Sequence, residues 1–523
     1  MTKIADIVEI REIPRALDPA TLRRVRDALD QNDGAPSLLS GPDIDSLLER
    51  YVAIDGPADD PLYALLKQLA ADPPAGAGFM MQGPAGSGKT HLLCVAALLL
   101  DYPSLRDRFV AANPRYAEPL GALARRRRPL VVPVALGEHR AEDENLEDII
   151  FDCAEAELSR PLHRIQLPLS EQSYSLDLVS RHILPRYQAE LDKHVRGRAG
   201  GFATWQDLAD ADPAGAVAAA RAFAGDIGYP LDFRQSRIER MARLSELLQQ
   251  RRIGAIVWLI DDLWQFLAGA GAKAVRNDIS LLEFLFQRSR LEPVSVLVAL
   301  RAGLEEINGI EPYVLAGIRD GFEAGFRLGI DRMRDVAHKR GIKPADAQAL
   351  ANAAASTHKA YTKAFGELTF SAERLARSYP LHPHAEPILE SIYQKYFAEG
   401  DALIDVLHAL RRPSAAGLLE RDYTRLVSLP DLFDMLSPRL AAHPRTADYV
   451  REVYDYYEKN AERISPEHPD AVIELIKSTI LLNAAGTPGP AAAAAELTGL
   501  DASGKPVASA QTAAEVLEQM RLR

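Results

Sequence analysis

The sequence alternates between short continuous runs of apolar residues and longer stretches whose apolar positions recur with helical spacing. Apolar runs of this length, bounded by turn residues or charges, are typical of buried strands. Four of them predict strands, at residues 78–82, 130–136, 255–260 and 294–299. Pro133 places the second strand at a sheet edge or a bulge, because proline has no N–H to donate to a neighbouring strand. Strands that alternate with helices indicate an α/β core with a parallel sheet.

An N-terminal segment, residues 1–74, precedes this core. Alternating apolar and polar residues at 4–10 predict a strand. Helical patterns follow around residues 19–30, 42–52 and 61–71. We therefore expect a small leading segment with one strand and three helices.

The core itself, residues 75–330, contains a helical insertion at about 150–245. Beyond the core strand patterns disappear, and helical patterns with charged faces predict an α-helical lid or bundle over residues 331–483. The remaining residues, 484–523, begin with a stretch rich in Ala, Gly, Pro and Ser, which is typical of a linker, and end with one predicted helix at 511–522. A length of 523 residues agrees with roughly three or four domains.

Residues 83–90 match the pattern G-x-x-x-x-G-K-[ST] without a mismatch, directly after the first strand and before a predicted helix. In such a loop the glycines let successive backbone amides point at phosphate oxygens. We expect Lys89 to pair with the β and γ phosphates and the Thr90 hydroxyl to bind Mg²⁺. The alternative is a glycine turn without a nucleotide. The expected cofactor-binding residues are Gly83, Pro84, Ala85, Gly86, Ser87, Gly88, Lys89, Thr90 and His91.

The third apolar run ends in two carboxylates, Asp261 and Asp262. A buried strand holds such side chains rigidly, which suits them to bind Mg²⁺ and to activate water. We expect Asp261 to hold the magnesium shell and Asp262 to polarise the water that attacks the nucleotide. Asp262 takes the place where many ATPases with a loop of this kind carry glutamate. The alternative is that the two aspartates cap the following helix.

Two arginines are further candidates. Arg301 follows the strand at 294–299, where it could sense the γ phosphate, and a solvated turn residue is the alternative. Arg319 could reach the phosphate of a neighbouring subunit as an arginine finger, although a surface salt bridge is the favoured interpretation. The pattern as a whole predicts an ATPase with ATP and Mg²⁺ as cofactors. The expected catalytic residues are Lys89, Asp262 and Arg301, and the expected metal ligands are Thr90 and Asp261.

Three other polar features have weaker functional interpretations. Four arginines at 125–128 predict a solvated helix end rather than a DNA contact, because the chain is acidic overall. His139 and Arg140 follow the second strand at the same sheet edge as the loop, where they could approach the nucleotide or pack the loop. His382 lies in a Pro-rich turn and is predicted to be structural, since no second metal ligand is spaced with it.

The overall charge limits the partners that the chain can bind unspecifically. It has 61 basic and 73 acidic residues and a formal charge of −12, which opposes unspecific binding to DNA or an anionic membrane. Cys94 and Cys153 have no metal-ligand spacing and cannot form a disulfide framework. The N-terminus is acidic where a signal peptide is basic, and the apolar run at 92–100 is about half the length that spans a bilayer. We expect a cytoplasmic protein without a membrane segment.

The segments GPAGSGKTH, IVWLIDDL, VSVLVALRAGLEEI and SYPLHPHAEPILESI together resemble the large ATPases of bacterial phage-defence islands, the BREX proteins called BrxC and PglY. The resemblance covers roughly residues 1–480. The loop and the acidic strand are common to the AAA+/STAND group of ATPases. Only the YPLHP-type segment and the order of elements point to the defence family. Members of that family are usually much longer than this chain.

The resemblance implies a P-loop NTPase core of the AAA+/STAND type, followed by a helical lid, whose nucleotide turnover rearranges or regulates a defence complex. It supports Lys89, Thr90, Asp261 and Asp262, while relatives tend to carry a different polar residue at Arg301. Implied partners are defence proteins such as a DNA methyltransferase, and the chain could form a homo-oligomer. Two alternatives stay open: a nucleotide-gated switch or scaffold with little turnover, and a DNA-remodelling or replication-loader AAA+ ATPase.

Overall fold

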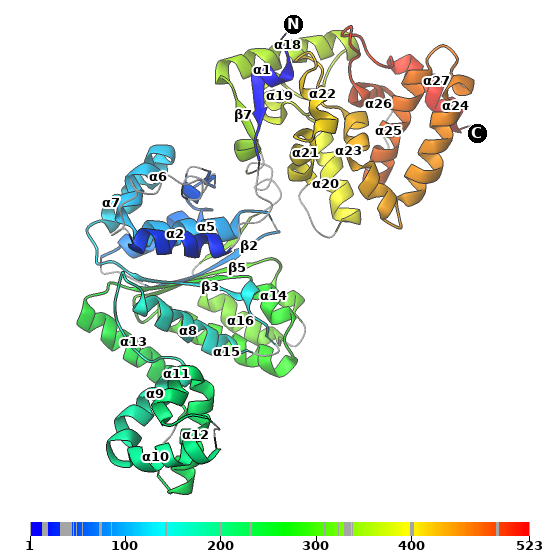
Figure 1. Ribbon diagram of the computed structural model, residues 1–523. Coiled ribbons are helices and arrows are strands. Elements are labelled where there is room, and N and C mark those ends of the chain that lie inside the picture. Colours follow the sequence, from blue (N-terminus) through cyan, green and yellow to red (C-terminus); the bar gives the residue numbers. More distant parts are fainter. Residues whose placement is uncertain are drawn as a thin grey trace. The chain divides into compact units, whose positions relative to one another are not determined.

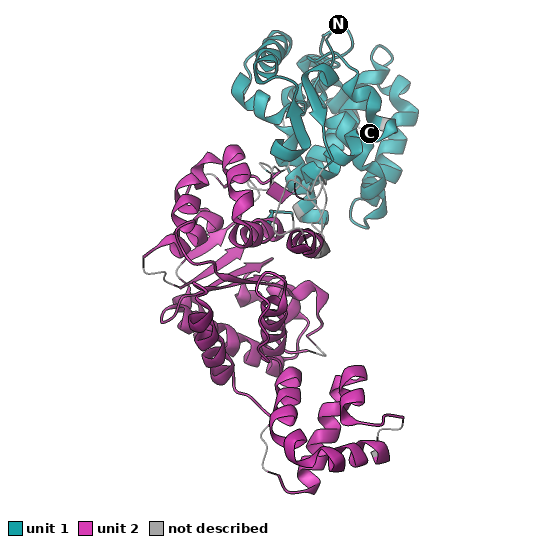
Figure 2. Ribbon diagram, turned by 60° about the vertical axis from the view of Figure 1, so that its left-hand side comes forward, with its two compact units in different colours: residues 1–16, 85–88, 329–523 teal, residues 17–84, 89–328 magenta. Residues whose placement is uncertain are grey.

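The structure is a computed structural model, and its chain forms two compact units (Figure 2). Unit 1 comprises Met1–Ala16, Ala85–Gly88 and Gly329–Arg523, and unit 2 comprises Leu17–Pro84 and Lys89–Leu328. The predicted leading segment 1–74 is therefore divided between the two units. The structure describes residues 2–12, 19–31, 44, 47–48, 50–54, 56–72, 76–84, 86–141, 144–198, 201–229, 233–307, 310–322, 324–328, 336, 338–397, 402–487 and 491–521.

Unit 2 is built on a five-stranded parallel sheet with the order β3-β4-β5-β2-β6 (Figure 1). All four predicted apolar runs are strands, and β3 lies at an edge, as Pro133 requires. The short edge strand β6 has no continuous apolar run to predict it. The strands are β2 (Ala77–Gln82), β3 (Leu130–Ala135), β4 (Ile256–Asp261), β5 (Val294–Leu300) and β6 (Ala324–Arg327).

Helices cover both faces of this sheet, which explains why its central strands are apolar throughout. On β4, Val257 and Leu259 pack into one helical layer, and Ile256, Trp258 and Ile260 pack into the other. The first layer contains α2 (Pro19–Gln31), α4 (Pro61–Ala70), α5 (Lys89–Asp101), α6 (Arg106–Ala112) and α7 (Ala117–Leu123). The second contains α8 (Leu146–Ser159), α13 (Arg237–Arg251), α14 (Leu263–Ala268), α15 (Ala272–Ser289) and α16 (Pro312–Gly321).

The fold class predicted from the sequence is therefore confirmed: an α/β P-loop core with a parallel sheet, followed in the chain by a helical region. The predicted helix around 42–52 lies partly outside the described residues. Every helix among the described residues is too short or too polar to cross a lipid bilayer. Short 3-10 or π turns join helices, or follow a strand in the case of η4 and η6: η2 (Pro103–Leu105), η3 (Pro114–Tyr116), η4 (Leu136–Glu138), η5 (Val179–Ile183), η6 (Leu304–Glu306), η7 (Pro413–Ala415) and η8 (Tyr449–Tyr454).

Between α8 and α13 the chain forms a helical insertion with a hydrophobic core of its own. Trp205 is buried in that core, and its indole N–H donates to the Ala216 carbonyl at 3.0 Å. Pro213 occupies the first turn of the last insertion helix, where its missing N–H costs nothing. The helices are α9 (Glu171–Leu178), α10 (Leu184–Arg198), α11 (Trp205–Ala211) and α12 (Pro213–Asp226).

Unit 1 is a helical bundle around one large apolar core, with a small antiparallel sheet of β1 (Val8–Ile10) and β7 (Ile342–Pro344). Its helices are α1 (Ile4–Ile7), α18 (Ala347–Phe365), α19 (Ala372–Ser378), α20 (Ala385–Tyr396), α21 (Ala402–Leu410), α22 (Ala416–Leu419), α23 (Leu429–Ala442), α24 (Asp455–Ile464), α25 (Pro469–Ala485), α26 (Ala491–Thr498) and α27 (Ala510–Arg521).

Two sequence-based predictions in unit 1 were wrong in part. Residues 4–10 form a strand only over their last three positions, because Ile4 and Ile7 are both buried by one helical turn. The Ala-rich segment predicted as a linker contains α26, whose Ala494 and Ala495 are buried in the bundle. Alanine is the strongest helix former, so a run of alanines forms a helix wherever a core can receive its small side chains.

Candidate functional site

The strands that carry the predicted site residues all end at one edge of the sheet. Gln82 lies beside Leu300 in the β2–β5 register, and the backbone N–H of Gly83 donates to the Leu300 carbonyl at 3.0 Å. Arg301 therefore leaves the sheet directly beside the first residue of the loop. Likewise, Ala135 of β3 lies beside Asp261 of β4. Ligands of open parallel sheets bind at this carboxyl edge.

The loop adopts the backbone conformation that its glycines allow. Gly86 and Gly88 have φ values of 84° and 89°, in the left-handed region that favours glycine. A Cβ at Gly88 would meet nothing within 4 Å, so backbone conformation rather than space explains this glycine. The Lys89 ammonium donates to the carbonyls of Gly83 and Pro84 at 2.7 and 2.8 Å. Ala85 lies outside the described residues.

Helix α5 begins at Lys89, so its first backbone amides follow the loop directly. Lys89 and Thr90 are the first two residues of this helix, and Thr90 lines a cavity together with Asp261. His91 is different, because its Nε2 lies 2.6 Å from the Leu47 carbonyl oxygen and its ring packs edge-on against Tyr51. The imidazole is thus part of the core of unit 2, and the prediction that His91 binds the cofactor applies at most to its backbone N–H.

Thr90 and Asp261 line the same cavity. Burial, followed by the neighbouring charge of Asp262, raises the pKa of Asp261 to about 6. The nearby Thr90 side chain and the backbone N–H of Asp262, which donates to the Asp261 carboxylate at 3.0 Å, oppose that rise. The structure therefore brings the two predicted magnesium ligands together, although they are 171 positions apart in the sequence (261 minus 90).

The predicted catalytic residues lie close enough to affect one another's protonation. Burial lowers the pKa of Lys89, the carboxylates of Asp261 and Asp262 oppose this, and Arg301 lowers it further. Burial also raises the pKa of Asp262, and the Lys89 charge opposes that rise. Two cations and two carboxylates thus surround the end of the loop, where a phosphate group would add negative charge.

Asp262 does not act as an ordinary helix cap. It precedes α14 with a left-handed φ of 58°, yet its side chain accepts no capping hydrogen bond from the helix. Its carboxylate instead accepts a hydrogen bond from the Gln265 amide at 3.2 Å. The capping alternative considered for the aspartate pair therefore does not explain the position of this side chain.

The residues at this edge fit a magnesium nucleotide. A hydroxyl and a carboxylate are oxygen ligands of the kind that Mg²⁺ prefers, and Mg²⁺ usually takes only one or two carboxylates from a protein, with phosphates and waters completing its shell. Among the described residues no group of three or more His, Cys, Asp or Glu side chains could form a protein-only metal cage. The donor set thus matches a metal bound together with phosphates.

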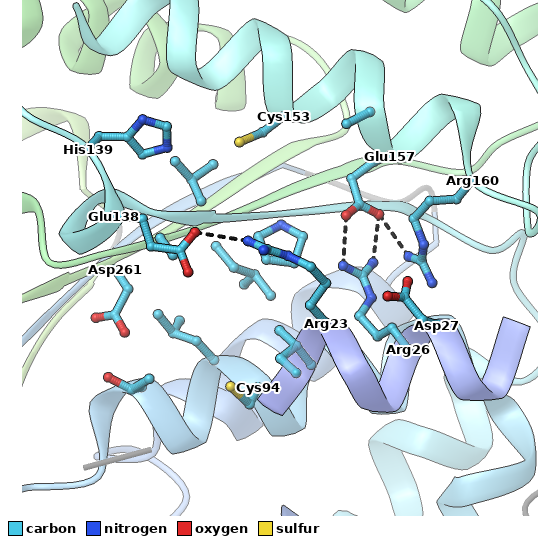
Figure 3. A pocket seen from close by; sticks show the side chains of 18 residues that line it. Arg23, Arg26, Asp27, Cys94, Glu138, His139, Cys153, Glu157, Arg160 and Asp261 are labelled. Atoms are coloured by element: carbon cyan, nitrogen blue, oxygen red, sulfur yellow. Dashed lines mark hydrogen bonds and ion pairs between the residues drawn. The ribbon is translucent and has the colours of Figure 1, made fainter. Parts of the chain in front are cut away.

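A cavity of about 240 Å³ extends from Thr90 and Asp261 along the open edge of β3, between α2 and α8 (Figure 3). Arg23 of α2 points toward Glu138, and their side chains form an ion pair at 2.9 Å. The sequence analysis did not identify these two residues, because they are 115 positions apart and match no motif. His139 also lines the cavity.

The remaining candidates have local partners. His139 Nδ1 lies 3.1 Å from Glu144, and the Arg140 backbone N–H donates to the same carboxylate at 3.3 Å. Arg319 pairs with Glu305 at 3.3 Å on the surface of unit 2, in agreement with the favoured interpretation. The arginines at 125–128 follow the end of α7 and are largely exposed, as predicted for a solvated helix end. His382 belongs to the core of unit 1.

Comparisons with known proteins add little to this description. No protein-family model and no curated protein match the chain. A structural search finds the Aeropyrum pernix Orc1 protein in complex with DNA, at 15% identity and a TM-score of 0.25, over 91% of this chain and 83% of that chain. Such a TM-score is too low to support a common fold. The fold assignment rests on the strand order and loop of this chain, and the resemblance to BREX ATPases finds no support in these comparisons.

Proposed function

We propose that this chain binds ATP with Mg²⁺ at residues 83–90 and hydrolyses it to ADP and phosphate. The observation that supports this most directly is that Thr90 and Asp261 line one cavity at the end of a glycine loop, close enough for Thr90 to lower the pKa of Asp261, since these two residue types share one Mg²⁺ in P-loop proteins. Thr90 and Asp261 would hold the ion, and its charge would offset the negative charge that develops on the phosphates.

The backbone of the loop, Lys89 and Arg301 each have a defined task in this proposal. The backbone amides from Gly86 onward bind the phosphates, and the start of α5 adds the positive end of its dipole. Lys89, held by the Gly83 and Pro84 carbonyls in this structure, turns to the β and γ phosphates when they bind. Arg301 contacts the γ phosphate from the end of β5.

Asp262 orients the attacking water and accepts its proton. The water oxygen forms a bond to the γ phosphorus while the bond from that phosphorus to the ADP oxygen breaks. A carboxylate with a pKa above its usual range is a better proton acceptor than an exposed one. Lys89 and Arg301 would stabilise the negative charge of the transition state, and a bound Mg²⁺ would add to that stabilisation.

Release of phosphate from ATP tests this proposal. The wild type should show Mg²⁺-dependent turnover, and Lys89→Ala should lose it together with most of the ATP affinity. Lys67→Ala serves as the matched control, because Lys67 is an exposed lysine on α4 in the same unit. Equal rates for the wild type and Lys89→Ala would refute the proposal.

A nucleotide-gated switch with little turnover is the second candidate. The observation that favours it is aspartate at position 262, whose shorter arm makes water activation slower unless the carboxylate is well aimed. A switch would bind ATP tightly, change its assembly state and complete fewer than about one turnover per minute. Sustained multiple turnover, with or without DNA, would exclude this reading.

The cellular role rests on sequence resemblance alone. We propose that turnover rearranges or regulates a bacterial phage-defence complex in the cytoplasm, with a DNA methyltransferase among its partners. In a homo-oligomer Arg319 would leave Glu305 to reach a neighbouring phosphate. Recovery of a methyltransferase with the tagged chain supports this role. Recovery of replication proteins, together with DNA-stimulated turnover, would favour the DNA-remodelling alternative.

A further inference from the structure

The carboxylate of Asp262 is confined on two sides by uncharged groups. On one side the Gln265 amide donates to Oδ1 at 3.2 Å. On the other side lies Gly137, where a Cβ would come within 2.7 Å of Oδ2, closer than side-chain carbons approach other atoms. The space that Asp262 occupies therefore exists because residue 137 has no side chain.

The sheet register explains how these residues meet. Ala135 and Asp261 are neighbours at the ends of β3 and β4, so the η4 turn with Gly137 and the turn at Asp262 leave the sheet side by side. Asp262 has a left-handed backbone, with φ of 58°, and its side chain makes no capping hydrogen bond to the backbone of the helix that follows. Gln265, one helical turn later on α14, reaches back to the same carboxylate.

We propose that Gly137 and Gln265 are positioning residues that aim the short side chain of Asp262 at the attacking water. This inference rests on the proposed function. It explains how the short side chain of Asp262 activates water at a position where many P-loop ATPases carry the longer glutamate. Neither residue contacts ATP in the proposal. Each acts by limiting the rotation of the Asp262 carboxylate, and a misplacement of about 1 Å can cost on the order of a hundredfold in rate.

Gly137→Ala is a selective test of this idea. Gly137 has no positive φ, so alanine does not strain the backbone. The atom that the new methyl group would meet is the free end of the Asp262 side chain, which can rotate away without moving the sheet. The substitution should therefore leave the fold and the phosphate loop intact and displace the carboxylate.

The expected result is a separation of binding from turnover. In Gly137→Ala, kcat should fall about tenfold to a hundredfold, while the Kd for a fluorescent ATP analogue with Mg²⁺ and the Tm stay within experimental error of the wild type. Gly121→Ala on α7 is the control, because a Cβ there meets nothing within 4 Å. Gln265→Glu keeps the size of the side chain but places a like charge against Oδ1, and it should lower kcat in the same way.

A double-mutant cycle with Asp262→Asn shows whether the effect passes through this residue. In that background Gly137→Ala and Gln265→Glu should cause no further loss of kcat. An undiminished loss in the Asp262→Asn background, or unchanged kcat in both single variants, would overturn the inference while leaving ATP hydrolysis established. If wild type and Lys89→Ala release phosphate equally, it is the proposed function that fails instead.

Discussion

At the scale of single residues, burial rather than sequence neighbourhood sets the charge states in this protein. Asp261 accepts a hydrogen bond from the backbone N–H of Asp262, yet burial still raises its pKa to about 6. His382 is an even stronger case. It is fully buried in unit 1, and burial lowers its pKa to about 3. At neutral pH this imidazole is uncharged, so its 3.5 Å approach to Glu496 is not an ion pair.

His382 should make unit 1 less stable in acid. Between its ordinary pKa near 6.5 and its folded pKa of about 3, the unfolded chain binds a proton that the folded chain rejects. The free energy of unfolding therefore falls as the pH falls through this window, by about 2 kcal/mol between pH 7 and pH 5. His384 and Arg374 add to the depression of its pKa, and the charge on Glu496 would oppose it.

Amide hydrogen exchange of α20 and α26 at pH 7 and pH 5, corrected for the intrinsic exchange rate, measures this contribution. His382→Gln should show a smaller loss of protection on acidification than the wild type, whatever its stability at pH 7. Burial raises the pKa of Glu496, so this residue makes the free energy of unfolding rise as the pH falls, opposite to His382. Both proteins keep Glu496, so its contribution is the same in each. Identical slopes in the two proteins would show that His382 does not cause the acid sensitivity.

At the scale of elements, helix α2 is fastened to the sheet by a buried ionic network. Arg26 donates to Asp101, the last residue of α5, at 3.0 Å. It also donates to Glu157 of α8 at 2.8 Å (Figure 3). Arg160 joins Glu157 and Asp101 and reaches back to Asp30 of α2 at 2.8 Å. The network therefore links α2 both to α5, the helix that follows the phosphate loop, and to α8, which lies beside the edge strand β3.

Removing one member of this network should cost far more than removing a surface ion pair of the same helix. Arg26→Met leaves the buried carboxylate of Asp101 without its main partner, and should lower the stability of unit 2 by about 3–5 kcal/mol. Arg23→Met, which breaks the exposed pair with Glu138, should cost about 0–1 kcal/mol.

Urea denaturation followed by tryptophan fluorescence measures both variants, since the three tryptophans at 205, 258 and 264 all belong to unit 2. Similar midpoints for Arg26→Met and Arg23→Met would show that the network does not hold α2 in place.

The same elements show what could be predicted from the sequence. The four long apolar runs and the helix that begins at Lys89 were predicted because their signals are local. β6 and α26 were not, since a four-residue strand and an alanine run have no periodic apolar face of their own. Arg23, Arg26 and Glu138 were missed for a different reason: their partners are distant in the sequence, and no motif marks them.

At the scale of the whole molecule, the chain is divided into separately packed cores. Among the described residues, unit 1 has one, the two faces of the unit 2 sheet have one each, and the insertion has a fourth whose buried members lie between 179 and 233. Because the insertion buries its own apolar side chains, its stability should not determine that of the nucleotide loop.

Trp205→Ala tests this independence. Loss of a buried indole and of its hydrogen bond to Ala216 should destabilise the insertion by about 3–5 kcal/mol. Hydrogen exchange should quicken in α9 to α12 and stay unchanged in β2, β4 and β5, with ATP affinity unaffected. Ile227→Ala, at an exposed position of the same insertion, is the control. A parallel loss of protection in the sheet strands would show that the insertion and the sheet unfold together.

The sequence by itself determined the glycine loop, the strand before it, the helix after it and the acidic end of β4, because each of these signals lies within about ten consecutive residues. Only the tertiary structure decided that Thr90 meets Asp261, that Arg301 leaves the sheet beside Gly83 and that Gly137 leaves room for Asp262. These contacts depend on strand order and register, which are set by the packing of whole helical layers against the sheet.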